Sequence, residues 1–531
     1  MLAWCGRHKW IATTSAVVVV IAAWLGVHAF VGSTPPPPPP PSAFPNNLVP
    51  IPVNVAPAKG VTFTLPESTT VASDAPDVGT YLAERLRVAT GYAVPATTHG
   101  DGTIALKLSG APAEVGAQGY GMTVTSDGVV IRANSAAGLF SGVQTLLQML
   151  PPAIEGKTKS AGPWTVPGAT IVDYPRFAYR GAMLDVARHF FSVAQVERYI
   201  DEIAMYKINY LHLHLSDDQG WRIAVDGWPN LTAVGASSSV GGDPGGFYTQ
   251  ADYSAIVKYA ASRYVTVVPE IDIPGHVNAA LASYATLNCD GKAPKPYTGI
   301  NVGFSSLCVP LPETYTFIDQ VIGQLAALTP GPYIHIGGDE STSTTEADYV
   351  AFINKAQQVV AAHGKTVIGW HDVTAAKLLP STVAEFWDTN PINNQVATAT
   401  AAGTKVIMAP ANHAYLDMKY DDGTSLGQTW AGETEVNTAY DWNPDGYIPG
   451  VKDASVLGVE AALWTETIRT SADIDYMAFP RLPAIAEVGW SPWSTHNVAS
   501  FDKRLATQGP RWAVMGINFY KSSQVPWPAD S

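Results

Sequence analysis

The chain has 531 residues, of which 47% are hydrophobic and only 14% are charged. This length exceeds that of one ordinary domain and predicts two or three domains with sizeable cores. The formal net charge is −14 and no basic stripe lies beyond the N-terminus, which excludes nucleic acid as a partner because that role depends on Lys and Arg neutralising phosphates.

The first segment of the chain predicts export. Arg7, His8 and Lys9 form a positively charged region, and residues 10–31 are nearly all apolar. This pattern is typical of a secretory signal, with a small-residue cleavage site near residues 27–29. The apolar run also reaches the ~20 residues that span a bilayer, so a cleaved signal and a retained membrane anchor through residues 10–31 both remain open. Either way, we expect an extracytoplasmic protein, secreted or anchored to the outer face of the cell membrane.

A proline-rich linker and a small domain follow. Pro35–Pro41 predicts a stiff polyproline spacer, and residues 1–45 are interpreted as signal or anchor plus linker. Residues 46–172 predict a small α+β domain without catalytic residues. Its expected elements are strands at 103–108, 122–125 and 129–132, with a Ser-Asp-Gly hairpin turn between the last two, and a helix at 135–150 that two prolines stop.

Residues 173–531 predict an α/β domain of the (β/α)8 barrel type, because short apolar strands alternate with helical stretches. The clearest helices begin at the capping boxes Ser192/Gln195 and Thr249/Asp252. The expected strands are 179–184, 210–215, 265–269, 333–336, 366–369, 383–386, 405–408 and 456–459.

Polar and aromatic residues follow each expected strand. In strand order they are Asp185 and Arg188; Asp217 and Asp218; Glu270, Asp272 and His276; Asp339 and Glu340; Trp370 and His371; Trp387 and Asp388; Tyr415 and Asp417; Trp464 and Glu466. The C-terminal strand ends of such a barrel form the active site. The recurrence of carboxylates with Trp at the same end of so many strands supports the barrel. The 15 Trp and 23 Tyr are more than a packed core needs, and sugar sites use such rings because a pyranose stacks its apolar face on them.

Two cysteines lie in the predicted barrel. Cys5 stays in the N-terminal segment, which leaves Cys289 and Cys308 for the exported part. Two cysteines in an oxidising compartment, separated by a Pro- and Gly-rich stretch, predict one disulfide that closes a loop.

Residues 335–340, with the sequence His-Ile-Gly-Gly-Asp-Glu, place two glycines and two adjacent carboxylates at a strand end. This segment resembles the signature of the family-20 glycoside hydrolases, the β-N-acetylhexosaminidases. Residues 180–189, 212–218, 270–276 and 464–466 resemble that family's other strand-end motifs. The small N-terminal domain is also similar to the one that precedes the barrel in the family, so the resemblance covers roughly residues 50 to 520.

The resemblance implies an exo-acting, retaining hydrolase of terminal β-linked N-acetylhexosamine (GlcNAc or GalNAc) on oligosaccharides or glycoconjugates, without metal or cofactor. The family is an exception to the two-carboxylate scheme, because the substrate's own 2-acetamido oxygen attacks the anomeric carbon and forms an oxazolinium ion. Glu340 would be the general acid and then the base. Asp339 would hold the acetamido N–H and stabilise the positive charge, and Tyr415 would bond the acetamido carbonyl.

The resemblance further implies a set of substrate-binding residues. Trp370, Trp387 and Trp464 would cage the acetyl group and the sugar face. Arg188, Asp417 and Glu466 would bind ring hydroxyls, with Asp417 at the C6 hydroxyl. Asp217 and His276 would support the catalytic pair, and Trp430 is a further candidate contact.

A metal-dependent hydrolase is an alternative interpretation of His212 and His214, because alternate residues of a strand put both rings on one face. With His276 and Asp339 they could surround a metal ion. This interpretation leaves the tryptophans unexplained.

The carboxylates allow two more interpretations. An ordinary two-carboxylate glycosidase would use Glu460 or Glu466 as its nucleophile. A carbohydrate-binding protein without activity would need no acid, and the presence of both Asp339 and Glu340 argues against it.

Overall fold

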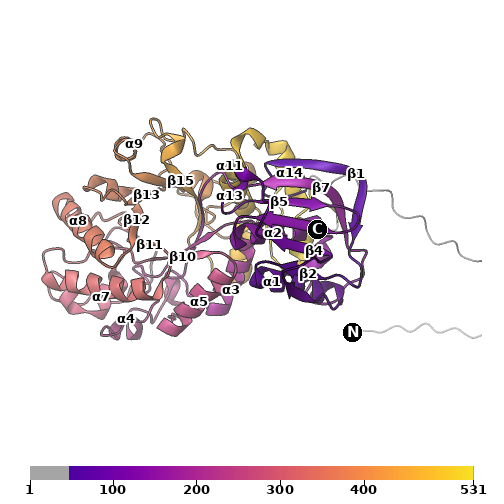
Figure 1. The fold of residues 1–531 in the computed structure, drawn as a ribbon. Coiled ribbons are helices and arrows are strands. Elements are labelled where there is room, and N and C mark those ends of the chain that lie inside the picture. Colours follow the sequence, from indigo (N-terminus) through magenta and orange to yellow (C-terminus); the bar gives the residue numbers. More distant parts are fainter. Residues whose placement is uncertain (1–46, 530–531) are drawn as a thin grey trace, which may run out of the picture. The chain divides into compact units, whose positions relative to one another are not determined.

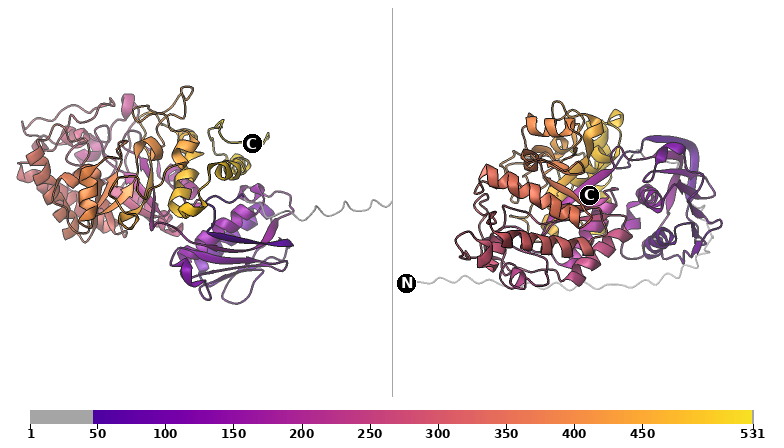
Figure 2. Two further views of the ribbon diagram at one scale, coloured as in Figure 1. Left: turned by 90° about the horizontal axis from the view of Figure 1, so that it is seen from above. Right: turned by 60° about the vertical axis from the view of Figure 1, so that its left-hand side comes forward.

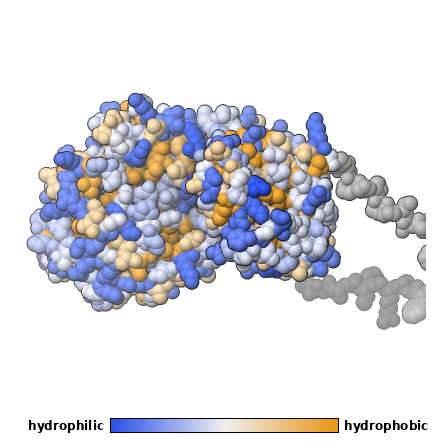
Figure 3. Space-filling view, viewed as in Figure 1, coloured by the Kyte–Doolittle hydropathy of each residue, from blue (hydrophilic) through white to orange (hydrophobic). Residues whose placement is uncertain are grey.

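The computed structural model describes residues 47–529. The signal or anchor at 10–31 and the proline-rich spacer therefore lie outside the described residues. Among residues 47–529, no helix is long and apolar enough to cross a membrane. Hydrophilic and hydrophobic residues are interspersed over the face shown in Figure 3.

The small domain contains a seven-stranded mixed sheet in the order β1-β7-β5-β6-β4-β2-β3. The strands are β1 (Asn54–Thr64), β2 (Val71–Ser73), β3 (Ala96–Thr98), β4 (Ile104–Lys107), β5 (Tyr120–Val124), β6 (Val129–Ala133) and β7 (Thr165–Asp173), accompanied by helices α1 (Pro76–Thr90) and α2 (Ala136–Met149). The predicted hairpin is confirmed as the antiparallel β5–β6 pair. The predicted helix is confirmed as α2, where Ser135 caps the N-terminus by accepting from the backbone of Gly138.

The sequence did not reveal β1, β2, β3, β7 or α1. In β1 the apolar alternation is broken, because its pairing with β7 shifts register between Pro57 and Thr62. An irregularity of this kind hides the period-two signal on which strand prediction depends.

The second domain is a closed barrel of eight parallel strands, which confirms the predicted fold class (Figure 1). Its strands are β8 (Tyr179–Asp185), β9 (Tyr210–His214), β10 (Thr266–Glu270), β11 (Tyr333–His335), β12 (Thr366–Trp370), β13 (Val383–Phe386), β14 (Lys405–Met408) and β15 (Val456–Leu463). All eight expected strands are present. The largest difference is at β15, which continues to Leu463 because it pairs with β8 as far as Leu184.

Helices surround the barrel and fill the connections between its strands. They are α3 (Val193–Ala204), α4 (Asn230–Ala233), α5 (Gln250–Ser262), α6 (Asn278–Ser283), α7 (Pro312–Leu328), α8 (Glu346–Ala362), α9 (Asn394–Ala401), α10 (Ala411–Ala414), α11 (Val436–Tyr440), α12 (Ser471–Ala478), α13 (Arg481–Trp490), α14 (Val498–Ala506) and α15 (Gly509–Met515). The capping boxes expected at Ser192 and Thr249 are both formed, at the starts of α3 and α5.

The small domain contacts the barrel at the N-terminal ends of the strands. Asp173, at the end of β7, forms a buried ion pair of 2.8 Å with Lys207 and accepts a bond from the Trp490 indole. Arg511 of α15 pairs with Glu155 at 2.6 Å, and Figure 2 shows the C-terminal helices in yellow next to the small domain. These contacts leave the opposite, C-terminal strand ends free for a site.

The predicted disulfide is present, and it joins Cys289 to Cys308 across a separation of 19 residues. The closed loop leads from α6 to α7. We expect the double variant C289S/C308S to lose about 3 kcal/mol of unfolding free energy, because the open loop gains conformational entropy in the unfolded chain. Urea denaturation of both proteins measures the difference, and equal midpoints with equal slopes would contradict the expectation.

Candidate active site

A cavity of about 340 Å³ opens at the C-terminal ends of the barrel strands. Its lining residues are Arg188, His276, Ile300, Val302, Asp339, Glu340, Trp387, Tyr415, Asp417, Gln428, Trp430, Trp464 and Glu466. Loops after most of the strands contribute to it, as expected for a barrel of this type. Ten of these residues are among those that the sequence singled out.

The backbone after β11 places the two adjacent carboxylates in different surroundings. Gly337 and Gly338 have φ values of 63° and 101°, and Glu340 itself has a φ of 47°, which is uncommon for a residue with a side chain. A Cβ atom on Gly337 would lie 1.8 Å from Oδ1 of Asp272, so no larger residue fits there. The turn leaves Asp339 buried, while the Glu340 side chain is 36% exposed at the cavity.

His276 lies between the two carboxylates. Its Nε2 is 3.4 Å from Oε2 of Glu340 and 3.6 Å from Oδ2 of Asp339, and its Nδ1 is 3.3 Å from Oδ1 of Asp217. Burial alone would lower the pKa of His276, but the charges of Asp217, Asp272 and Asp339 raise that pKa well above its usual range. A charged imidazolium therefore faces the carboxylate pair.

Asp339 has an unusual protonation equilibrium. Burial raises the pKa of its carboxyl to about 7, although His276 acts in the opposite direction. Its Oδ1 is buried and has no hydrogen-bond partner in the protein. A buried acceptor of this kind is costly unless a ligand supplies a donor, so Asp339 is suited to bind an N–H or O–H group in the cavity.

Two further carboxyls lack protein partners. Both oxygens of Asp417 and the Oε2 of Glu466 are buried without a donor. Burial, followed by the charge of Glu466, raises the pKa of Asp417 well above its usual range. Arg188, by contrast, is held in place by Asp217 at 2.8 Å and by Asp185 at 3.5 Å. The cavity thus offers free acceptors to a ligand rich in hydroxyl groups.

Aromatic rings form one wall of the cavity. Tyr415 lies 5.9 Å from Trp430 and 6.1 Å from Trp464 between ring centroids, and Trp387 lies 6.1 Å from Trp430. Trp370 is only 1% exposed and lies behind this wall, 5.7 Å from Trp464. Sugar rings pack against such surfaces through their C–H faces.

The structure also shows how the remaining predicted residues are placed. Asp217 and Trp370 are not among the residues that line the cavity; they lie behind it, against Arg188 and Trp464 respectively. Gln428 lines the cavity without having been predicted, and so do Ile300 and Val302. The exposed apolar side chains of Ile300 and Val302 lie in the loop between the cysteines. The predicted disulfide that closes this loop was the feature of the sequence that could have indicated them.

The contacts do not support His212 and His214 as metal ligands, or Glu460 as a nucleophile. Both ring nitrogens of His212 contact carboxylates, Glu460 at 2.7 Å and Glu270 at 2.9 Å, and His214 is likewise held between Glu270 and Asp217. Histidines engaged in this way have no lone pair to offer a metal. Glu460 is fully buried and does not line the cavity, so it cannot reach an anomeric carbon.

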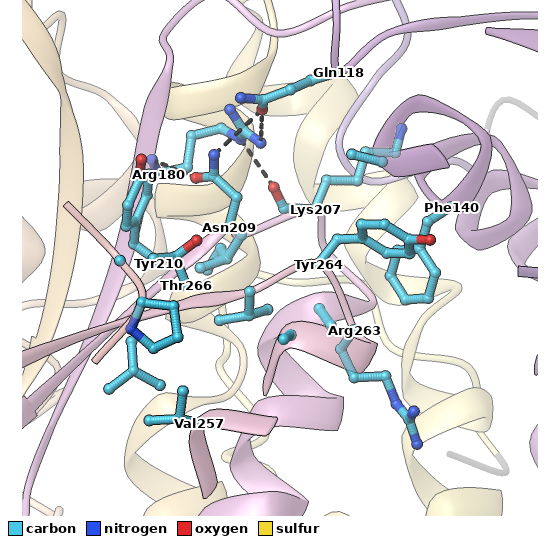
Figure 4. A pocket seen from close by; sticks show the side chains of 18 of the residues that line it. Gln118, Phe140, Arg180, Lys207, Asn209, Tyr210, Val257, Arg263, Tyr264 and Thr266 are labelled. Atoms are coloured by element: carbon cyan, nitrogen blue, oxygen red, sulfur yellow. Dashed lines mark hydrogen bonds between the residues drawn. The ribbon is translucent and has the colours of Figure 1, made fainter. Parts of the chain in front are cut away.

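A second cavity, of about 520 Å³, lies at the opposite end of the barrel, where the small domain meets the strands (Figure 4). The Arg180 guanidinium donates to the side chain of Gln118 and to the carbonyl of Lys207, and the Asn209 amide also donates to Gln118. Because the protein itself satisfies these groups, this cavity is a seam between domains and shows no convergence of reactive groups.

Comparison with known proteins agrees with this geometry. The model of the glycosyl hydrolase family 20 catalytic domain matches residues 177–349 and 341–493, and that of the family's domain 2 matches residues 46–174. The chain belongs to glycosyl hydrolase family 20. It is a β-N-acetylhexosaminidase, as its motifs predicted.

Several relatives of this family-20 enzyme are similar over nearly their whole length. The β-N-acetylhexosaminidase of Cellulomonas fimi is 43% identical, over 91% of this chain and 97% of the relative. The structure of the Streptomyces plicatus N-acetyl-β-hexosaminidase in complex with thio-NAglucal is 54% identical, with a TM-score of 0.89, covering 91% of this chain and 98% of that one. The family-20 enzyme of Streptomyces coelicolor A3(2) is 53% identical, with the same TM-score, covering 91% of this chain and 99% of that one.

Proposed function

We propose that Asp339 and Glu340 catalyse the release of a terminal non-reducing β-linked GlcNAc or GalNAc from oligosaccharides or glycoconjugates, with the sugar bound in the 340 Å³ cavity. The observation that carries this assignment is the placing of the pair: one carboxyl is buried with a free acceptor, and the other is partly exposed. His276 contacts both, so the two groups belong to one catalytic unit.

Glu340 is assigned the proton transfers. Its partly exposed position suits contact with the glycosidic oxygen, which receives the proton as the leaving group departs. The carboxylate that results takes a proton from the incoming water in the second step, and that water opens the oxazolinium ring with net retention.

Asp339 is assigned to the acetamido group. Its unpartnered Oδ1 can accept the acetamido N–H, which orients the carbonyl oxygen toward the anomeric carbon. Its negative charge then faces the positive charge that develops on the oxazolinium ring, where a fixed charge in a dry site stabilises the transition state. The intramolecular attack gains the usual advantage of proximity.

The cavity walls are assigned to binding. Tyr415 is assigned to donate to the acetamido carbonyl, and Trp464 and Trp387 are assigned to enclose the sugar and its acetyl methyl group. The free oxygens of Asp417 and Glu466 accept from ring hydroxyls, which satisfies acceptors that the protein leaves unpaired.

A small substrate panel tests the proposed activity. We expect hydrolysis of aryl β-N-acetylglucosaminides, aryl β-N-acetylgalactosaminides and chitobiose, with the β-anomer of the sugar released first. A matching aryl β-glucoside, which lacks the acetamido nucleophile, is the control. Efficient hydrolysis of that glucoside would rule out the assigned mechanism.

We also propose that the enzyme works outside the cytoplasm, secreted or held at the outer face of the membrane. The charged and apolar pattern of residues 7–31 and the Cys289–Cys308 disulfide support this location. Cell fractionation with N-terminal sequencing of the mature protein tests it, and a protein recovered from the cytosol with its N-terminus intact would refute it.

We expect the enzyme to prefer neutral sugars over 6-sulfated ones, on the order of tenfold or more in kcat/KM at pH 7. Asp417 is expected at the C6 hydroxyl, and neither it nor Glu466 offers a sulfate a counter-charge. Parallel assays of the aryl β-GlcNAc and its 6-sulfate measure the ratio. Equal rates on both substrates would contradict the assignment of Asp417 to the C6 hydroxyl.

A further inference from the structure

A row of alternating carboxylate and histidine side chains occupies the barrel interior below the cavity, and the proposed catalytic steps do not use most of it. From the middle of the strands toward the cavity, this carboxylate–histidine row consists of Glu460, His212, Glu270, His214, Asp217 and His276. Each neighbouring pair is in contact. No member is more than 2% exposed.

His214 is held between two carboxylates. Its Nε2 is 2.9 Å from Oδ2 of Asp217, and its Nδ1 contacts Oε2 of Glu270. Only an imidazolium, which carries a proton on each nitrogen, can donate to both. Burial lowers the pKa of His214, but Glu270, Asp217 and the nearby Asp185 together raise it to about 9. The imidazole also packs against the Trp464 ring in an edge-to-face arrangement, with 4.9 Å between the ring centroids.

Glu270 connects this row to the aromatic wall. Its Oε1 accepts the indole N–H of Trp370 at 3.0 Å, and Trp370 packs against Trp464. The other groups near the Glu270 carboxylate include His212, on the same oxygen as His214, and His335, whose Nδ1 lies 3.0 Å from Oε1. The Asp272 carboxylate also lies within 4.8 Å of Glu270 and His214. The Glu270 carboxylate therefore contacts both Trp370, which supports the aromatic wall, and His214, which supports Asp217 next to the catalytic pair.

Asp217 connects the carboxylate–histidine row to the active site. It holds the Arg188 guanidinium with Oδ2 and His276 with Oδ1, and His276 contacts Glu340. The orientation and charge of His276 thus depend on a carboxylate whose other side is fixed by His214.

We propose that Glu270 and His214 are positioning residues of the active site, which fix Trp370 on one side and the Asp217–His276 pair on the other. This inference rests on the proposed roles of Asp339 and Glu340. Arg188 and His276, together with the hydrogen bond from His214, keep Asp217 ionised. His214 also fixes the position of Asp217, and Asp217 in turn holds His276 against the catalytic pair.

The variant Glu270→Gln tests the proposal, because it keeps the shape and removes the charge behind His214. We expect kcat to fall about 10-fold or more. We also expect the alkaline limb of the kcat/KM profile to move about 1 pH unit or more to lower pH, because His214 then loses its proton more easily. A purely structural role for Glu270 would lower stability without moving that limb.

Glu460→Gln is the matched control. Glu460 is equally buried and bonds the same kind of imidazole, His212, but lies on the side of Glu270 away from the cavity. It should lower the melting temperature by a comparable amount and leave the pH profile in place. Identical pH profiles for both variants and the parent would overturn the proposal, whereas a parent enzyme inactive on aryl β-GlcNAc would refute the proposed function instead.

A measurement on the unmodified enzyme covers the case in which Glu270→Gln fails to fold. With ¹⁵N-labelled histidine, His214 is expected to show both ring nitrogens protonated at pH 7.5, as resonances that His214→Gln removes. A neutral His214 at that pH would overturn the proposal.

Discussion

Replacing Glu340 with Gln is expected to slow the hydrolysis of chitobiose and other substrates with poor leaving groups about 10²–10⁴-fold. The glutamine keeps the shape of the side chain but has no proton to give to the glycosidic oxygen. Aryl glycosides with strongly acidic phenols need little protonation, so their first step should be slowed much less. Steady-state rates over a series of phenols of graded pKa measure this dependence.

The slope of that series distinguishes the roles of the two carboxyls. For Glu340→Gln, log kcat/KM should rise steeply as the phenol becomes more acidic, and the parent enzyme should show a shallower line. If the variant instead lost the same factor with every leaving group, Glu340 would not be the general acid.

Replacing Asp339 with Asn is expected to lower kcat about 10²–10³-fold, and the loss should persist with activated leaving groups. The asparagine occupies the same space, but no negative charge faces the developing oxazolinium ion. Cyclisation itself is therefore impaired, whichever group departs. Rates on the same phenol series, compared with those of Glu340→Gln, measure the contrast.

Added azide provides the control for Asp339→Asn. Deletion of a true enzymic nucleophile allows azide to attack and to give an inverted glycosyl azide, whereas an enzyme that relies on the substrate's own acetamido group should give no such product. An inverted azide product would show that Asp339 attacks the anomeric carbon directly.

The unfolding free energy of Asp339→Asn shows whether the variant is folded, and its dependence on pH should differ from that of the parent. Folding raises the pKa of Asp339 from 3.8 to about 7. The parent protein is therefore most stable below pH 3.8, where this carboxyl is neutral in both states, and it loses that stability as the pH rises through 7. Asn cannot ionise, so at pH 8 the unfolding free energy of the variant should exceed that of the parent by up to about 4 kcal/mol. The advantage should shrink as the pH is lowered toward 4, which pH-dependent denaturation can measure.

The sequence was sufficient for the barrel and for the two adjacent carboxylates that line its cavity. Parallel strands buried on both faces are continuous apolar runs, so Val383–Phe386 and Lys405–Met408 were visible with their observed bounds. Strand ends are where a barrel exposes polar groups, and the sequence therefore placed Asp339, Glu340 and Tyr415 at one end of the barrel.

Only the tertiary structure decided what each of these groups touches. The sequence could not tell that Glu270 bonds His214 and Trp370, since these residues are brought together by barrel closure and not by chain spacing. For the same reason, the sequence could not show that burial raises the pKa of Asp339 or that its Oδ1 has no hydrogen-bond partner in the protein. Motif and period are local properties of a chain, whereas desolvation and charge pairing depend on every neighbour that folding brings within a few ångströms.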